Sequence, residues 1–340
     1  MPAADHTLDR HRFHAAWDPA IPPLLTVSSG ATLTIATRDA ANGKLRDRLT
    51  ADDLARVPDD LRALLDRDAA RYAADEELAG HALTGPIDIG GARPGDVLQI
   101  DVLAIEPADW GWTSFGPGFG LLAAEFPTRY THVWDLRGGR DSALRAGVRV
   151  PLEPFCGVMG VAPDVPAPVS TVPPRAVGGN MDIKQLIAGA TLYLPIAVAG
   201  ARFSVGDVHA AQGDGEVCGT GIEMESTVTL RLTCRRDLTI TGPQFELPSP
   251  LPGAWNTAGW YATTGHGPDL FVVTQDAIRQ MIEHLVARRG LTREEAYVLC
   301  SVAVDLKISE VVDAPNWLVS ALLPKGLFRD QDADPPRTNA

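Results

Sequence analysis

The chain is poor in cysteine and has no long apolar run, and both shortages narrow what it can be. Only four of its 340 residues are cysteine, and none forms a Cys-x-x-Cys pair. Such low, scattered usage is typical of a reducing compartment. No apolar stretch approaches the ~18 residues that a membrane-spanning helix needs, and the N-terminus lacks the apolar core of a signal peptide. We therefore expect a cytoplasmic protein that does not contact a membrane.

The chain also has no excess of positive charge, and it lacks the common nucleotide-binding motifs. Its formal net charge is -13, which argues against a nucleic-acid partner because phosphate binding needs clustered lysine and arginine. Phosphate-loop and dinucleotide fingerprints are missing, which argues against ATP or NAD as cofactors. The hydrophobic content of 45% and the charged content of 21% are ordinary for a globular protein. The length suits one large domain or two smaller ones that share an interface.

Short apolar runs between turn residues predict strands in the first third of the chain. Residues 24–27, 31–37 and 97–105 are rich in β-branched side chains and are bounded by Pro, Gly or Asp. Residues 51–72 instead repeat leucine and valine at helical spacing, which predicts one or two short helices. Four glycines in residues 111–120 favour a flexible or pocket-lining loop.

The middle of the chain predicts further extended segments. Residues 151–174 contain too many prolines for a long helix, but their apolar centre indicates a packed, extended segment. Residues 190–205 and 220–233 are again typical of strands. Side chains alternate across a strand, so Glu223 and Glu225 face the same side, opposite an apolar set that suits the core.

The C-terminal region predicts helices. Apolar residues at 278, 281, 282 and 285 follow helical spacing, and Gly290 is placed as a helix stop. Thr292 and Glu295 form a capping-box pattern that opens a second helix. The last residues, 331–340, are predicted to be a polar tail.

Residues 206–216 hold the greatest density of potential ligands in the chain. This stretch carries one imidazole, three carboxylates and one amide, and its three glycines predict a mobile turn. A second polar group precedes it at residues 178–182, and Glu223 follows it. We interpret Asp207, which follows a glycine, as a residue that shapes the turn.

Metal-assisted hydrolysis is the chemistry that this density favours. A catalytic divalent ion takes imidazole and carboxylate ligands, and a base deprotonates water beside it. Asp182, His209 and Glu223 could supply ligands from three segments, which leaves Glu216 or Asp214 for proton transfer. An oxygen-rich version of the same site would suit calcium or magnesium.

Covalent catalysis is less favoured. Cys156 lies in an apolar context without a basic neighbour, and Cys218 follows acidic residues that would raise the pKa of its thiol. The Gly-x-Ser-x-Gly motif of serine hydrolases is absent. Among the other histidines, His81 precedes a tight turn before a strand and could reach a cleft.

Many blocks of the sequence resemble motifs of the acetamidase/formamidase family, and they occur in the same order as in that family. The resemblance runs through nearly the whole chain. The blocks that carry it are Leu83-Thr84-Gly85-Pro86-Ile87, Gly91-Ala92-Arg93-Pro94-Gly95-Asp96, Pro117-Gly118-Phe119-Gly120, Pro154-Phe155-Cys156-Gly157-Val158-Met159-Gly160-Val161, Gly178-Gly179-Asn180-Met181-Asp182, Val205-Gly206-Asp207-Val208-His209, Gln212-Gly213-Asp214-Gly215-Glu216 and Glu294-Glu295-Ala296-Tyr297.

The resemblance implies a fold and an assembly. The expected fold is a β-rich α+β fold, with sandwich-like sheets and a smaller α/β portion. It would form a single domain over residues 1–330, or two subdomains of about 1–150 and 151–330. Family members are usually homo-oligomers, so we expect a dimer or trimer.

The resemblance also implies hydrolysis of short carboxamides, such as formamide and acetamide, with a zinc or calcium ion. The site residues it implies are Asn180, Asp182, His209, Asp214, Glu216 and Glu223. Zinc is the expected metal, calcium the second. We expect Glu216, or else Asp214, to act as the base, and Asn180 to stabilise the oxyanion. Hydrolysis of lactams or other cyclic amides, and binding of a small amide or metal without turnover, remain the alternatives.

Overall fold

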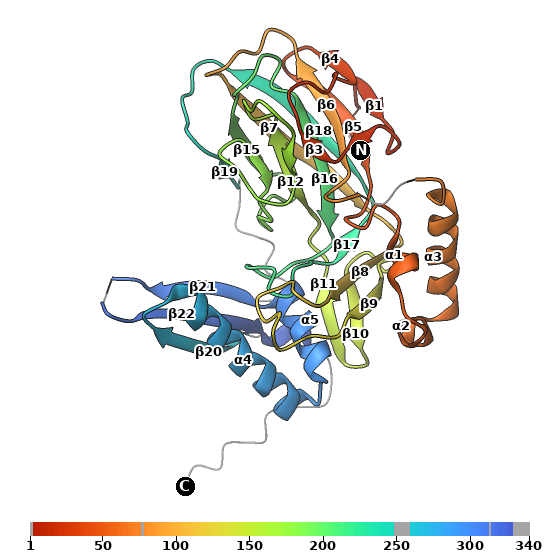
Figure 1. Cartoon of the computed structure of the whole chain (residues 1–340), viewed down its shortest axis with the longest axis vertical. Coiled ribbons are helices and arrows are strands. Elements are labelled where there is room, and N and C mark those ends of the chain that lie inside the picture. Colours follow the sequence, from red (N-terminus) through yellow and green to blue (C-terminus); the bar gives the residue numbers. More distant parts are fainter. Residues whose placement is uncertain (1–2, 76–77, 248–258, 313, 329–340) are drawn as a thin grey trace.

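Two large β-sheets and a smaller α/β unit make up the protein (Figure 1). The structure is a computed structural model, and it describes residues 3–75, 78–247, 259–312 and 314–328. The expected polar tail at 331–340 lies outside the described residues. The fold class is confirmed as β-rich α+β.

The first large sheet has six strands. Its core strand β5 alternates between fully and partly buried residues, as the pattern of residues 31–37 predicts. Residues predicted as a strand at 97–105 form β7, which is two residues longer. In spatial order the strands are β1 (His6–Leu8), β5 (Ala31–Thr37), β18 (Ser226–Arg235), β7 (Val97–Pro107), β15 (Thr191–Pro195) and β19 (Gln244–Glu246).

The second large sheet has nine strands and carries the acid-rich stretch. Its central strands β12 and β16 are buried at every residue, which confirms the packed, extended segment predicted within 151–174. Its main path is β14 (Gly178–Asn180), β12 (Phe155–Val161), β16 (Phe203–His209), β17 (Glu223–Met224), β8 (Trp110–Phe115) and β9 (Tyr130–Asp135), and β16 also pairs with β6 (Leu83–Ile89), which pairs with β2 (Phe13–His14) and β4 (Leu25–Val27).

Two sequence predictions about glycine-rich segments are wrong in their first parts. The loop predicted over 111–120 begins only after strand β8, which ends at Phe115, and the turn predicted over 206–216 begins only after His209, the last residue of buried strand β16. The glycines serve close packing instead. A Cβ on Gly111 would lie 2.7 Å from the carbonyl oxygen of Glu223, and one on Gly206 would lie 2.5 Å from that of Ala82.

The single strand predicted over 190–205 is also wrong, because the chain turns within it. It forms strand β15 of one sheet and the start of β16 in the other. Ala201 and Arg202 adopt left-handed backbone angles, with φ of 63° and 56°. The turn takes the chain from one sheet to the other. Because the residues on both sides of it are apolar, the sequence pattern did not reveal where the first strand ends.

Three helices from the N-terminal part cover one side of the molecule (Figure 1). They confirm the helical spacing seen in residues 51–72. Their apolar residues pack with Trp110 and Trp112 of β8 in a small core of their own. The helices are α1 (Leu45–Arg48), α2 (Ala51–Arg56) and α3 (Asp59–Arg71).

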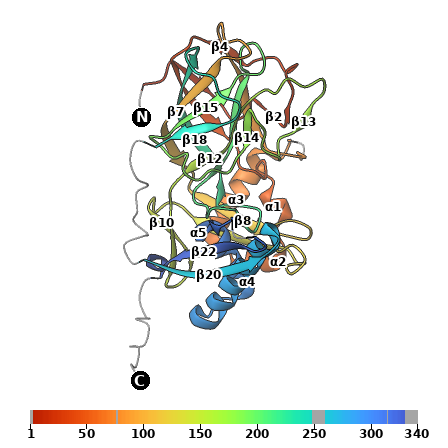
Figure 2. The ribbon, with the colours of Figure 1, turned by 90° about the vertical axis from the view of Figure 1, so that its left-hand side faces the viewer.

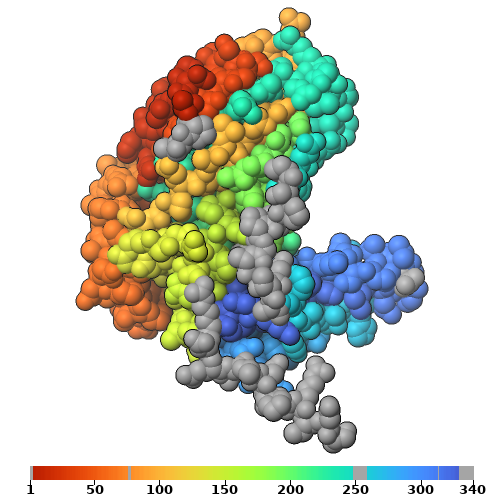
Figure 3. Space-filling model, turned by 180° about the vertical axis from the view of Figure 1, so that it is seen from behind, coloured from red at the N-terminus to blue at the C-terminus, as the bar shows by residue number. Residues whose placement is uncertain are grey.

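The smaller α/β unit is formed by the C-terminal part of the described chain, and it projects from the body (Figure 3). Helix α4 (Leu270–Arg289) packs along a three-stranded sheet (Figure 2) and ends at Gly290, whose φ of 62° is left-handed. Helix α5 (Arg293–Ala303) begins with the predicted capping box of Thr292 and Glu295. The sheet order is β20 (Trp260–Gly267), β22 (Trp317–Pro324) and β21 (Asp305–Glu310).

The remaining elements are short. They are the hairpin of β10 (Asp141–Arg145) and β11 (Val148–Pro151), the pair β3 (Ala16–Trp17) and β13 (Val169–Ser170), and a 3-10 turn at Lys325–Leu327. None of the described helices is long and apolar enough to cross a membrane.

Strands from both halves of the sequence share the two large sheets. Strand β18 pairs with β5 and β7, and β16 pairs with β6. The α/β unit is tied to the acid-rich stretch as well, because Gly213 N donates to Ser301 O and Leu306 N donates to Asp214 O. This interleaving favours a single domain over 1–330, which stays a prediction, as does the alternative division near residue 150.

Candidate functional site

His209 is the centre of the acid-rich site. It is the last residue of β16, where it pairs with Phe155 of β12 and Glu223 of β17. Its side chain is 1% exposed. The Phe155 ring meets the imidazole edge to face, with a centroid distance of 5.1 Å. Sheet pairing and aromatic packing therefore fix the position of the imidazole.

Carboxylates surround the Nε2 atom of His209. Glu223 Oε2 lies 3.1 Å from it, Asp207 Oδ2 lies 3.5 Å from it and Glu216 Oε1 lies 3.9 Å from it. Asp182 offers an oxygen that lies within 4.8 Å of the ligand atoms of His209 and Glu216. Three carboxylates thus approach one imidazole nitrogen, and the fourth, that of Asp182, completes the cluster.

Unusual backbone angles direct these carboxylates. Asp182, Asp207 and Glu216 have φ values of 51°, 53° and 43°. Left-handed angles cost a non-glycine residue roughly 1–2 kcal/mol, and such strain is often concentrated at functional sites. The two aspartate side chains also need a glycine at position 157. A Cβ on Gly157 would lie 2.7 Å from Asp182 Oδ1 and 2.9 Å from Asp207 Oδ2, which is too close for either carboxylate to keep its position.

The interpretation of Asp207 as a residue that only shapes a turn is wrong. Its carboxylate is buried and faces two imidazoles, at 3.5 Å from His209 Nε2 and 3.8 Å from His81 Nε2. The glycine before Asp207 suggested a turn, but it allows close strand packing. Alternation along β16 places Asp207 on the same side as His209, and this signal would have identified it.

Gln212 is a second site residue that the sequence did not single out. His209 Nδ1 lies 2.8 Å from Gln212 Oε1, and Gln212 Nε2 donates to the Asp182 carbonyl oxygen at 2.9 Å. Its place three residues after His209 was visible in the sequence. The sequence does not show that the chain folds back so that the Asp182 carbonyl lies at the NH₂ end of the Gln212 side chain.

The crowding of charge shifts the pKa values of the site. Burial would lower the pKa of His209, but Glu223 and Asp207 raise it well above its ordinary value. Burial, followed by the Asp182 carboxylate, raises the pKa of Glu216 well above the ordinary value. Burial would likewise raise the pKa of Asp207, but His81 and His209 hold it below its usual range. The site is therefore built around groups that compete for protons.

The donor set fits a divalent cation. Among the described residues, no arginine or lysine forms a salt bridge with Asp182, Asp207, Glu216 or Glu223. Asp182 Oδ1 and Asp207 Oδ1 are buried without a hydrogen-bond partner in that part of the chain. Buried charges are costly unless they are paired or bind a metal, and the residue groups Asp182–His209–Glu216 and Asp207–His209–Glu223 could each hold an ion.

The structure separates Asp214 from the other predicted site residues. Its carboxylate lies 3.3 Å from Gln185 Nε2, and its backbone N donates to Asp305 Oδ1 at 3.1 Å. Asn180 ends β14, two residues before Asp182, and its Oδ1 is buried without a partner among the described residues. His81 is 16% exposed at the side of the cluster.

The cysteines lack the properties of nucleophiles. Cys156 and Cys218 are free and buried. Burial raises the pKa of Cys156 to about 12 and that of Cys218 to about 11. Thiols with such pKa values are protonated near neutral pH.

Comparisons with known proteins agree with this geometry. A formamidase of Methylophilus methylotrophus is 25% identical, over 93% of this chain and 89% of its own length. An acetamidase of Mycolicibacterium smegmatis is 28% identical, over 84% of each chain. Among solved structures, a gamma lactamase from Delftia acidovorans superposes with a TM-score of 0.82 at 28% identity, over 98% of this chain and 95% of that one. The sequence model of the Acetamidase/Formamidase family matches residues 3–169 and 166–330, so the chain belongs to that family.

Proposed function

We propose that this protein hydrolyses short linear carboxamides to a carboxylic acid and ammonia with the help of a divalent metal ion. The observation that carries the proposal is the largely buried cluster of four carboxylates around His209, without an arginine or lysine partner among the described residues. Family membership supports the reaction class, because the hydrolases of this family act on linear amides.

Asp182, His209 and Glu223 would hold the metal, and the position of Asp207 makes it a further ligand. Imidazole nitrogen suits zinc, whereas calcium prefers a purely oxygen set. Zinc is therefore the metal that we propose, with calcium second. A divalent ion at such a site supplies Lewis-acid chemistry, which polarises a carbonyl group and lowers the pKa of water.

Glu216 is the proposed general base. Burial and the neighbouring Asp182 raise its pKa above the ordinary carboxyl value, which favours a role in proton transfer, and its side chain is 19% exposed, so substrate and water can reach it. Glu216 takes a proton from the attacking water as the new C–O bond forms, and it returns a proton to the leaving nitrogen as the C–N bond breaks. Asp214 is the weaker candidate because it lies with Gln185 and Asp305.

Asn180 and His81 complete the proposed site on its open side. The Asn180 amide can donate to the oxyanion of the tetrahedral intermediate, which is a stabilising arrangement common in acyl transfer. His81 can contact the amide nitrogen and carry a proton, since its ring lies at the partly exposed side of Asp207.

Lactam hydrolysis is the second candidate, and a specific observation supports it. The gamma lactamase from Delftia acidovorans matches nearly the whole fold.

A cytoplasmic location and a homo-oligomeric state (dimer or trimer) stay predictions of the sequence. The four free cysteines agree with a reducing compartment.

A panel of amides tests the proposal. Purified protein loaded with Zn²⁺ is assayed for ammonia release from formamide, acetamide and propionamide, and for ring opening of γ-butyrolactam. We expect the linear amides to have the higher kcat/KM, with activity lost on chelation and restored by Zn²⁺. Faster ring opening would favour the lactamase alternative, and turnover of neither class would contradict both.

A further inference from the structure

Gln212 lies buried between two segments that carry metal ligands. Its side chain is 2% exposed. One end of the amide faces His209 Nδ1 at 2.8 Å, and the other end donates to the backbone carbonyl of Asp182 at 2.9 Å. A single side chain therefore joins the end of β16 to the loop after β14.

The contact with Asp182 determines which atom donates and which accepts in the contact with His209. A backbone carbonyl oxygen can only accept, so the NH₂ group of Gln212 must face Asp182. The amide oxygen of Gln212 then faces His209 Nδ1, which must donate a proton to it. When the imidazole is neutral, its remaining nitrogen Nε2 then carries the lone pair that a cation held by the surrounding carboxylates would accept.

Close neighbours restrict the imidazole on two sides. A Cβ on Gly221 would lie 2.9 Å from His209 Nδ1, so this backbone closes one side of the ring. Phe155 meets the ring at a right angle, with an interplanar angle of 83°. Gln212 consequently acts on an imidazole whose orientation is already restricted, and what it adds is the position of the proton.

We propose that Gln212 is a positioning residue that keeps the His209 proton on Nδ1 and so makes the site prefer cations that accept a nitrogen ligand, such as Zn²⁺, over Ca²⁺. This inference rests on the metal-assisted function proposed above. Hydrogen bonds to the second nitrogen of a ligating histidine fix its tautomer and raise its basicity, and their loss typically costs 10–100-fold in metal affinity.

Zn²⁺ and Ca²⁺ affinities of Gln212→Met test the inference by competition titration. We expect Zn²⁺ binding to weaken by about 10–100-fold, and Ca²⁺ binding to change much less because it does not depend on an imidazole lone pair. Gln275→Met is the matched control: the Gln275 side chain also donates to a backbone carbonyl, that of Leu121 at 2.8 Å, but from α4. It should leave both affinities unchanged.

A second readout follows the proton itself. In the Zn²⁺-loaded wild type, the His209 Nδ1 proton should give a slowly exchanging, downfield NMR signal, assigned by its absence in His209→Gln. Gln212→Met should lose this signal. Gln212→Glu keeps an acceptor for the proton, so it should retain the signal and lose less Zn²⁺ affinity than Gln212→Met.

Three results would overturn the inference. Unchanged Zn²⁺ affinity in Gln212→Met contradicts it, and so does an equal loss of Zn²⁺ and Ca²⁺ binding, which would indicate a merely structural role. A wild type that binds neither ion removes the proposed metal function as well, so the two failures are distinguishable. If Gln212→Met does not fold, Gln212→Asn gives the same test, since its amide is too short to span both contacts.

Discussion

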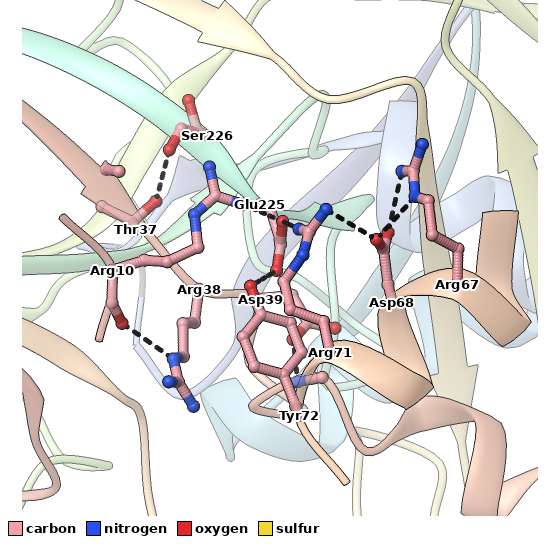
Figure 4. Close-up of polar contacts among 12 residues, drawn as sticks. Arg10, Thr37, Arg38, Asp39, Arg67, Asp68, Arg71, Tyr72, Glu225 and Ser226 are labelled. Atoms are coloured by element: carbon pink, nitrogen blue, oxygen red, sulfur yellow. Dashed lines mark hydrogen bonds and ion pairs between the residues drawn. The ribbon is translucent and has the colours of Figure 1, made fainter.

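Glu223 and Glu225 stand two residues apart in the sequence, yet they belong to opposite kinds of acidic cluster. Glu223 faces His209 and other carboxylates. Glu225 is neutralised by guanidinium groups (Figure 4): Arg10 binds its Oε2, Arg71 Nη1 lies 3.2 Å from the same oxygen, and the Tyr72 hydroxyl donates to Oε1. Among the described residues, the first cluster has no arginine or lysine partner, whereas the second one has both Arg10 and Arg71.

Asp68 extends the neutralised cluster in the same manner. Arg67 Nε donates to its Oδ1 at 3.0 Å, and Trp110 Nε1 donates to its Oδ2 at 2.8 Å. A cavity of about 500 Å³ opens beside these residues, but Asp68 and Glu225, which line it, already have protein partners. Arginine cannot give up its charge at physiological pH, so this network holds α3 against the sheets, whereas the His209 cluster is left able to bind a cation.

Removing the carboxylate of Glu216 should have the largest effect on the functional side of this comparison. We expect Glu216→Gln to lower kcat for amide hydrolysis by about 10²–10⁴-fold, the usual contribution of a general base. Metal content should change little. Steady-state kinetics, together with metal analysis of the same preparation, measure both quantities.

Asp214→Asn is the matched control for that measurement. Asp214 lies on the same loop, but its carboxylate contacts Gln185. Its substitution should lower kcat by no more than a few-fold. A large loss in Asp214→Asn with little loss in Glu216→Gln would transfer the role of base to Asp214.

Removing the charge of Glu225 should act on stability instead. Glu225→Gln leaves Arg10 and Arg71 without their shared anion in a largely buried place. Breaking a buried ion pair costs about 3–5 kcal/mol, but the two arginine side chains are 23% and 38% exposed. We therefore expect a loss of about 2 kcal/mol in the free energy of unfolding, smaller than for a fully buried pair.

Urea denaturation measures that loss, and the activity per folded molecule should stay at the wild-type value. A variant with unchanged stability and greatly reduced activity would place Glu225 in the functional site. The two clusters would then not be distinct in the way that their charge partners indicate.

Local patterns of the sequence predicted the elements but not these partners. Alternation predicted β5, and the capping box at Thr292 is a contact between residues three apart. The shared side predicted for Glu223 and Glu225 does not rest on one continuous strand, because Glu225 lies between β17 and β18. The Arg10–Glu225 pair instead joins residues 215 positions apart. Nothing local to Glu225 reveals that its charge is neutralised, so both glutamates were equally plausible as site residues.

The residues of the site were likewise predictable only where the signal is local in the sequence. Asp182, His209, Glu216 and Glu223 could be grouped because polar residues are dense near them and the family blocks include them. Asp207 was missed because the glycine before it was interpreted as a turn signal, although alternation along the strand places it on the side of His209. Gln212 was missed because its role depends on the loop that returns past Asp182, which tertiary packing rather than the local sequence determines.

Glu223→Gln should give the smallest effect, and its sign should be opposite to that of Glu225→Gln. Its Oε1 accepts from Gly221 N at 2.8 Å, a bond that glutamine can keep. The substitution removes one negative charge from a cluster that lacks arginine and lysine partners among the described residues. We expect the metal-free protein to gain about 1 kcal/mol of stability, since relieving strain at a functional site commonly has this effect, and Zn²⁺ affinity to fall. Urea denaturation in the presence of chelator, with Glu225→Gln measured beside it, tests the sign. If both variants were destabilised alike, Glu223 would be as well compensated as Glu225, and the cluster around His209 would not be an open cation site.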